Sequence, residues 1–265
     1  MQTDFSSYRK ARGVNWSTLT AMQKSPLHYH HRLITPREDT PAMAQGRLIH
    51  TAVLEPERLD ADYAVWNGRR GTNAYKEWLE GQAGRQIVTV EEYGKALNIA
   101  DAVWHHPVAR QVLAGGKTEQ MLTWIDPATR LLCKARPDHI RGRNLADLKS
   151  TRDVDAHYFG RTSANLGYHG QMAFYRRAVV ACRRVVDPVV RFVVVEQEPP
   201  HDVAVYVLSE DVLYVGDQLV QRLLDLVVRY RRFTRPPGAH PTEEPLAFPT
   251  WAWPEDMSDE IEVLS

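Results

Sequence analysis

The sequence predicts an α/β fold in which helices flank a central mixed β-sheet. Helical patterning extends to residue 113, strand-like runs begin near residue 118, and the chain then continues as helix, strand, strand and helix. One of the late runs, VVRFVVVEQ, is almost continuously apolar, which is typical of a strand buried on both faces. Helices packed on both faces of one sheet explain this order of elements.

The N-terminal part predicts helices. Residues 17–34 predict either one helix capped by Ser17 or two short helices, because Pro26 interrupts the pattern. A further helix is expected from about Pro41 to residue 55, because Pro56 stops it.

The next segment predicts a turn and two more helices. Residues 66–73 read WNGRRGTN, which is typical of an exposed basic turn. Helices are expected over residues 74–82 and 91–113, and the second carries apolar residues at helical spacing.

Three strand-like runs then predict a β-meander. They cover residues 118–125, 131–140 and 145–151, and the turn-like clusters DPATR and RGRN separate them. We therefore expect three consecutive antiparallel strands.

The last third alternates helix and strand. A helix is expected over residues 165–182 and strands over 189–197 and 202–208; Ser209 caps a helix that extends to about residue 233. The composition then shifts to proline and acidic residues with Trp251 and Trp253. We predict one domain over residues 1–235 and a loosely ordered tail over 236–265.

Composition excludes several classes of site. Only Cys133 and Cys182 occur, which argues against a disulfide framework and a four-cysteine zinc or iron–sulfur site and favours the reducing cytoplasm. No stretch approaches the ~18–20 apolar residues of a membrane helix, and residues 1–13 contain no apolar core of a secretory signal. We expect a cytoplasmic protein without a membrane partner.

Charge gives no overall indication of a polyanion partner. The 33 Lys and Arg residues balance 33 Asp and Glu residues. Affinity for phosphates depends on local clusters, however, and the Arg residues do cluster. Each cluster taken alone is more typical of a solvated helix face or turn. The clusters are Arg69–Arg70, Arg141 with Arg143, Arg176–Arg177, Arg183–Arg184 and Arg229–Arg232.

The stretch CKARPDHIRGRNLADLKST places acidic residues on a predicted hairpin. If residues 141–144 form the turn, Asp138 pairs with Asp147, and their Cβ atoms lie about 4.5–5.5 Å apart. Lys149 shares the face of Asp147, because strand side chains alternate. A slip of one residue would place the two aspartates on opposite faces.

Two carboxylates this close repel each other unless one binds a proton or both bind a cation. Oxygen ligands of this kind suit Mg²⁺ or Mn²⁺. A neighbouring lysine can hold the attacking water and stabilise developing negative charge. The alternative is a surface ion pair between Asp147 and Lys149 with a separate aspartate on the hairpin.

These residues resemble the motif of a known superfamily. Pro137–Asp138 followed by Asp147-Leu148-Lys149 resembles the signature of the PD-(D/E)xK restriction-endonuclease-like nucleases. The segment GRLIH at residues 46–50 resembles the GxxxH helix of its RecB- and RecE-like branch, and QMAFY at 171–175 resembles the QxxxY motif. Over roughly residues 15–200 the chain looks like the RecE-type phage exonucleases, the exodeoxyribonuclease VIII group.

The resemblance implies a role for each matching residue. Asp138 and Asp147 match the metal-binding carboxylates, Lys149 matches the catalytic lysine, and His50 matches the histidine that completes the metal site. The carbonyl of Leu148 would be a further ligand. Without the motif, a histidine on an apolar helix such as His50 would be an ordinary core residue.

Further residues are expected beside the predicted metal site. Gln171 and Tyr175 lie four residues apart on one helix face and would contact the DNA backbone or orient the active site. Glu119 is a candidate outer carboxylate. The histidines at 28, 30 and 31 are expected on a solvated or DNA-facing segment.

The resemblance implies a Mg²⁺- or Mn²⁺-dependent exonuclease that digests linear double-stranded DNA from the 5′ end and leaves 3′ tails. Implied partners are double-stranded DNA, a single-strand annealing protein and further copies in a ring-shaped trimer or tetramer. No Walker-type GxxxxGK[ST] motif for a fused helicase occurs. A repair or restriction endonuclease, a non-catalytic DNA-binding protein on the same fold and an unrelated metal-dependent hydrolase remain alternatives.

Overall fold

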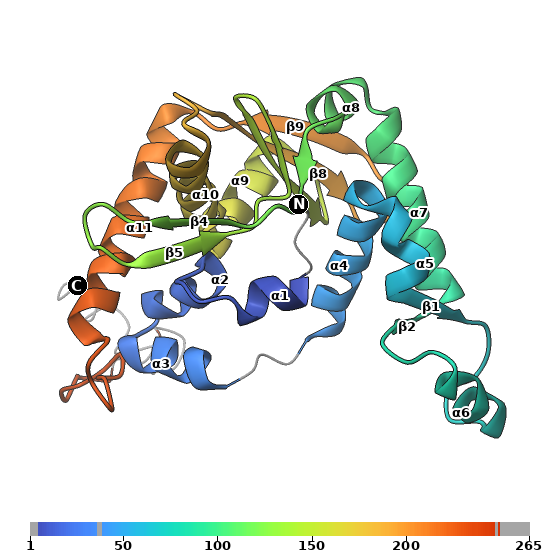
Figure 1. Ribbon diagram of the computed structural model, residues 1–265, viewed down its shortest axis with the longest axis horizontal. Helices are drawn as coiled ribbons and strands as arrows, with labels where there is room; N and C mark the ends of the chain where they lie inside the picture. Colours follow the sequence, from blue (N-terminus) through green and yellow to red (C-terminus); the bar gives the residue numbers. More distant parts are fainter. Residues whose placement is uncertain (1–4, 36–38, 247–248, 250–265) are drawn as a thin grey trace, which may run out of the picture.

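The computed structural model of the protein, which describes residues 5–35, 39–246 and 249, is built on a five-stranded sheet (Figure 1). The strand order is β3-β6-β7-β8-β9; β7 and β8 are parallel, and the other neighbours are antiparallel. The predicted mixed sheet with flanking helices is therefore confirmed. The strands are β3 (Lys117–Thr118), β6 (His139–Arg141), β7 (Asn144–Thr151), β8 (Val189–Glu196) and β9 (Val203–Val207).

Helices cover both faces of the sheet and form two hydrophobic cores. The first core packs α2 (Trp16–Leu19), α9 (Ala156–Leu166), α10 (Tyr168–Arg183) and α11 (Glu210–Tyr230) on one face. The second packs α4 (Pro41–Leu54), α7 (Val90–His105) and α8 (Pro107–Leu113) on the other. Strand β8 contributes Phe192 to the first core and Val193 to the second, as expected of a strand buried on both faces.

The alternation along β7 fixes the direction of the charged residues. Leu145 belongs to the first core, whereas Ala146 and Leu148 belong to the second. Asp147 and Lys149 therefore point to the side of Leu145, where α10 packs. The register also agrees with the prediction, because Ile140 pairs with Leu145.

The predicted meander of three strands is wrong in one respect. Its first two runs are each divided between the sheet and a separate antiparallel ribbon of β4 (Leu122–Ile125) and β5 (Leu132–Ala135). The breaks fall at Glu119, which has a left-handed φ of 51°, and at Pro137, which has no amide hydrogen to donate. The two breaks lie side by side, because the Glu119 N–H donates to the carbonyl of Asp138 at 3.0 Å.

Among the N-terminal predictions, one helix cap needs correction. Residues 17–34 form the two-helix alternative, with a 3₁₀ turn η1 (Thr20–Gln23) and α3 (Pro26–Ile34) after α2. The helix cap is Asn15 rather than Ser17, since the Asn15 side chain accepts from the Thr18 N–H. The expected helix from Pro41 is confirmed as α4.

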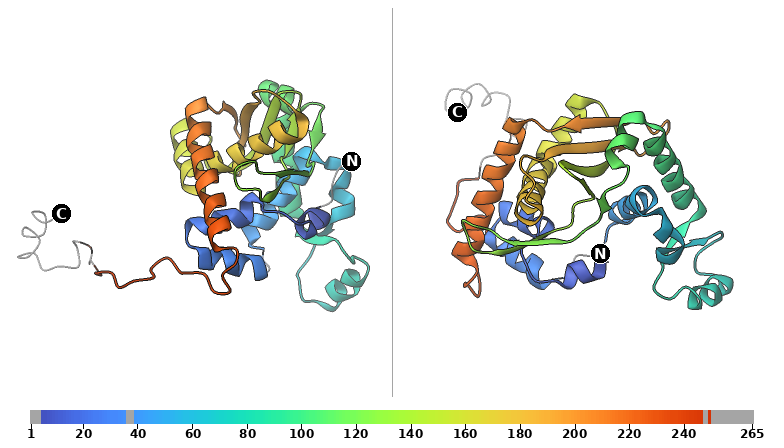
Figure 2. Two further views of the ribbon diagram at one scale, coloured as in Figure 1. Left: turned by 60° about the vertical axis from the view of Figure 1, so that its left-hand side comes forward. Right: turned by 45° about the horizontal axis from the view of Figure 1, so that its top comes forward.

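The region after α4 holds elements that the sequence did not reveal. A parallel pair of strands, β1 (Tyr63–Trp66) and β2 (Gln86–Thr89), flanks α6 (Asn73–Glu80), which projects from the body (Figures 1 and 2). The short helices η2 (Pro56–Arg58) and α5 (Leu59–Asp62) precede them. The helix predicted over 91–113 is divided into α7 and α8 at Pro107, which α8 accommodates in its first turn.

The C-terminal elements largely follow the prediction. Helix α9 was not predicted, and Gly167 separates it from α10 with a left-handed φ of 70°. Ser209 caps α11 as expected. After α11, the carbonyl of Pro237 accepts from the Leu27 N–H of α3 at 3.0 Å. Trp251 and Trp253 lie outside the described residues. Among the described helices, none is both long and apolar enough to cross a bilayer.

Candidate metal centre and active site

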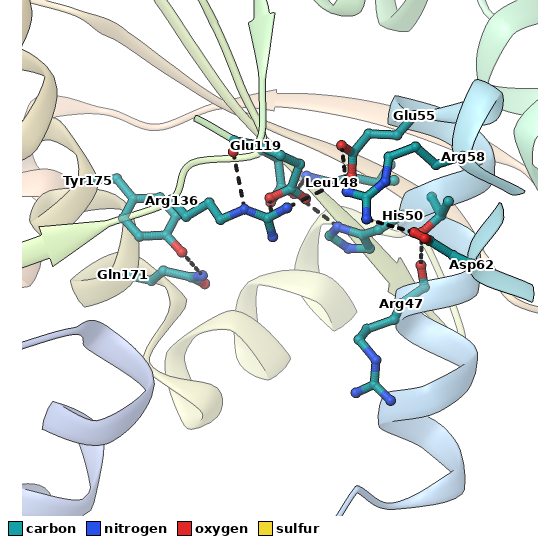
Figure 3. Close-up of polar contacts among 12 residues, drawn as sticks. Arg47, His50, Glu55, Arg58, Asp62, Glu119, Arg136, Leu148, Gln171 and Tyr175 are labelled. Carbon is teal, nitrogen blue, oxygen red and sulfur yellow. Dashed lines mark hydrogen bonds and ion pairs between the residues drawn. The ribbon is translucent and has the colours of Figure 1, made fainter. Parts of the chain in front are cut away.

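Three side chains from separate segments converge where the ribbon leaves the sheet. They are His50 on α4 and Glu119 after β3 (Figure 3), together with Asp138 before β6. One ligand atom from each lies within 4.8 Å of the others, and His50 Nδ1 is 3.4 Å from Asp138 Oδ2. A histidine nitrogen and two carboxylates at these separations form a donor set for a divalent cation.

Helix α4 positions His50 through the residues around it. Leu48, Ile49, Ala52 and Val53 are buried in the second core and fix the rotation of the helix. His50 is half-buried and faces Asp138. The predicted histidine of the metal site is thus placed at the cluster, and it is not an ordinary core histidine.

Asp138 is fixed by the hairpin whose register the sequence predicted. The ladder ends with His139 paired to Ala146, so Asp138 lies directly before the paired residues of the hairpin. The Leu148 N–H donates to Asp138 Oδ2 at 2.7 Å, so the carboxylate lies against β7. Leu148 thus contacts the site through its amide, and metal binding by its carbonyl stays a prediction.

Asp147 is the most deeply buried carboxylate of the site, with 1% of its surface exposed. Neither carboxylate oxygen has a hydrogen-bond partner among the described residues, although Lys149 forms an ion pair with it. Burial, then repulsion from Asp138, raises the pKa of Asp147 to about 6, against the opposing effect of Lys149. Lys149 offsets part of the cost of burying this charge, and a further cation beside Asp147 and Asp138 would lower their mutual repulsion.

Lys149 is held in its charged form. Burial lowers its pKa, but the carboxylates of Asp147 and Asp138 outweigh this effect and raise the pKa overall. Its ammonium group donates to Gln171 Oε1 at 3.0 Å and lies 4.4 Å from the centre of the Tyr168 ring. The lysine is therefore a fixed positive charge beside Asp147.

The two α10 residues of the QxxxY pattern form a chain that ends on this lysine. Gln171 Nε2 donates to the hydroxyl of Tyr175 at 3.1 Å (Figure 3), while the amide oxygen of Gln171 accepts from Lys149. Burial raises the pKa of Tyr175 well above its usual value, so the phenol stays neutral. Of the two roles predicted for Gln171 and Tyr175, this geometry favours orientation of the active site.

Glu119, predicted as an outer carboxylate, is one of the three converging side chains, and a residue that sequence reasoning missed supports it. Arg136 Nη1 is 2.8 Å from Glu119 Oε2, and its Nε donates to the Glu119 carbonyl at 3.1 Å. Arg136 also approaches Glu55, at the end of α4, to 3.9 Å. Burial, then Asp138, raises the pKa of Glu119 well above normal, while Arg136 opposes the rise. The only sequence signal for Arg136 was its position directly before Pro137–Asp138.

Comparisons with known proteins agree with this fold. The model of a family described as "PDDEXK-like domain of unknown function (DUF3799)" matches residues 15–240. The chain belongs to this family. A crystal structure of a provisionally named exonuclease from Eubacterium rectale has a TM-score of 0.59 and 13% identity, with 93% of this chain and 97% of that chain covered. At this identity the likeness shows a shared fold. No curated protein matches the chain in sequence.

The residues of this PDDEXK-like domain fit a divalent metal ion. His50, Glu119 and Asp138 supply the converging donor atoms, and Asp147 supplies a neighbouring carboxylate whose oxygens lack hydrogen bonds. Repulsion among the buried carboxylates is the cost that a bound cation would remove.

Proposed function

We propose that this PDDEXK-like domain is a Mg²⁺- or Mn²⁺-dependent exodeoxyribonuclease of the RecE type. It hydrolyses linear double-stranded DNA from the 5′ end and leaves 3′ single-stranded tails, which an annealing protein uses in phage-type recombination. The observation that carries the proposal is the convergence of His50, Glu119 and Asp138 beside Asp147 and Lys149. The name of the structural neighbour, an exonuclease, supports the choice of activity.

Each group has a distinct task in this reaction. His50, Glu119, Asp138 and Asp147 would hold the cation, which when bound supplies an acidified water and neutralises charge on the phosphate. Lys149 places a fixed ammonium group where negative charge develops on the phosphate oxygens. Gln171 and Tyr175 keep this ammonium group in position, since they form a hydrogen-bonded chain with it.

The proposed partners follow from the same function. A ring of three or four copies would enclose the duplex, and its channel would present cations to DNA while the exterior stays acidic. This arrangement reconciles a net charge of zero with DNA binding.

Digestion of labelled DNA tests the proposal. Linear duplex labelled at the 5′ or the 3′ end, and covalently closed circular duplex, are incubated with Mg²⁺ or with EDTA. We expect release of the 5′ label first, no attack on the circle and no reaction in EDTA. Nicking of the closed circle would assign an endonuclease instead, and the absence of any cleavage would contradict a nuclease.

A lysine substitution separates chemistry from binding. Lys149→Met is expected to lower kcat by about 10²–10³-fold, because it removes one fixed charge from the transition state. DNA affinity should change by less than about threefold. Lys76→Met, on the exposed face of α6, is the matched control and should cleave like the wild type. Full activity of Lys149→Met would contradict the assigned role.

A further inference from the structure

The N-terminal helices form a strongly basic unit on a chain without net charge. Residues 5–35 comprise α1 (Phe5–Lys10), α2, η1 and α3. They contain no Asp or Glu and five Lys or Arg residues, so the rest of the chain has five fewer Lys and Arg than Asp and Glu. The five are Arg9, Lys10, Arg12, Lys24 and Arg32. We call residues 5–35 the basic unit.

Three cations of the basic unit are available to a ligand. Lys10, Arg12 and Lys24 are exposed, and none of them makes an ion pair with a carboxylate within the described part of the chain. Many other arginines are neutralised internally; Arg143 and Arg177, for example, are paired with aspartates. Exposed cations without anionic partners create a local positive potential whatever the total charge.

The basic unit is fixed to the segment that carries the candidate metal centre. Val14 lies beside β5; its N–H donates to the Leu132 carbonyl at 2.9 Å and its carbonyl accepts from Lys134 at 2.8 Å. The buried Lys134 side chain donates to the carbonyls of Tyr8, at 2.7 Å, and of Arg9 and Ala11. These bonds hold the end of α1 and the following loop on the ribbon.

This attachment limits the distance between the basic unit and the metal centre. The bridge partner of Val14 is Cys133, five residues before Asp138. Five residues span at most about 18 Å, which is an upper limit on the separation of Cys133 from Asp138. Phosphates on one strand of a duplex rise about 3.4 Å each, so this limit covers about five phosphates.

A groove beside Arg12 lies where the basic unit meets the ribbon. Arg12, Asn15, Thr18, Tyr29 and Leu33 line it together with Leu132 of β5, so it has one cation among polar and apolar side chains. In Figure 1, α1, α2 and α3 lie together on the lower side of the molecule, and α1 extends toward α4. An arginine with short polar groups beside it can contact phosphates and sugars without reading base sequence.

We propose that the basic unit binds the phosphate backbone of duplex DNA a few nucleotides from the scissile phosphate. The inference rests on the proposed nuclease function and deepens it by assigning the surface that holds the substrate. Duplex DNA is the occupant that the observations favour, because the segment with the unpaired cations is bonded through Val14 to β5, and the chain leads from β5 to Asp138 of the candidate phosphodiester-cleaving centre. Binding is independent of sequence and strongly dependent on salt.

Charge reversal tests the proposal by binding rather than by cleavage. Anisotropy of a labelled 20-base-pair duplex is measured in EDTA between about 50 and 200 mM salt for wild type and the variant K10E/R12E/K24E. We expect at least about tenfold weaker binding, and a slope of log K against log salt that is smaller by about two to three. Circular dichroism and the Tm verify that the variant is folded.

A charge-matched control isolates the position of the cations. R110E/R130E/R184E changes the net charge equally, at exposed residues on α8, in the β4–β5 turn and after α10. Its affinity should stay within about threefold of wild type. If K10E/R12E/K24E binds like this control while wild type cleaves linear DNA, the inference fails and the proposed function stands. Tighter binding by K10E/R12E/K24E would also overturn the inference, and would assign the surface to an acidic competitor such as residues 243–262. If wild type neither binds nor cleaves DNA, the proposed function itself fails.

Discussion

Asp138→Asn is expected to abolish metal-dependent DNA cleavage while the protein remains folded. Asp138 Oδ2 lies 3.4 Å from His50 and accepts from the Leu148 N–H, so this carboxylate joins the α4 side of the site to β7. The asparagine oxygen can keep the bond to Leu148, but the negative charge at the centre is lost. Loss of roughly 4 kcal/mol of transition-state stabilisation corresponds to about a 10³-fold lower kcat/KM.

Initial rates on end-labelled linear duplex check this expectation. Asp101→Asn is the matched control, because it makes the same chemical change at an exposed position on α7, and it should cleave at the wild-type rate. The unfolding midpoint of Asp138→Asn in urea should equal or exceed that of wild type without metal. Residual activity above about one tenth of wild type would show that Asp138 does not hold the reacting centre.

The metal-free protein is expected to lose stability relative to Asp147→Asn as the pH rises from about 4 to above 6. Burial, then Asp138, raises the pKa of Asp147 from 3.8 to about 6, so the folded state binds more protons than the unfolded state in this window. The free energy of unfolding therefore falls with rising pH. A shift of about two pKa units corresponds to ~3 kcal/mol.

Urea unfolding in EDTA at pH 4, 5, 6 and 7.5 measures this difference. The free energy of unfolding of Asp147→Asn minus that of wild type should grow by up to about 3 kcal/mol across the series and then stay constant. Mg²⁺ should stabilise wild type more at pH 7.5 than at pH 5, because protons compete for the same oxygens. A constant difference at all four pH values would show that the Asp147 carboxylate carries no folded-state penalty.

The parts of the site that local rules govern could be predicted from the sequence. A short turn set the register that brings Asp138 against β7, and the period of two placed Lys149 on the face of Asp147. The helical period placed Gln171 beside Tyr175, and these residues are hydrogen-bonded to each other. These are short-range relations, and they hold whatever the rest of the chain does.

The parts of the site that depend on strand breaks and long-range pairing could not be predicted from the sequence. Glu119 joins His50 and Asp138 only because two strand-like runs are interrupted, one by a left-handed residue and one at Pro137. Hydrophobic patterning does not report either interruption. The pairing of β1 with β2 joins segments that α6 separates in the sequence. Arg136 supports the site through an ion pair with Glu119, and no rule of sequence spacing predicts that ion pair.

Binding of Mn²⁺ is the most direct test that residues from three separate segments hold one cation. Free Mn²⁺ is measured by its electron paramagnetic resonance signal during titration of wild type, His50→Gln, Glu119→Gln and Asp138→Asn. Wild type is expected to bind Mn²⁺, and each variant to bind it at least about tenfold more weakly, because each loses one donor of the same cluster. Equal Mn²⁺ affinity in wild type and all three variants would contradict the assignment of this cluster as the metal centre.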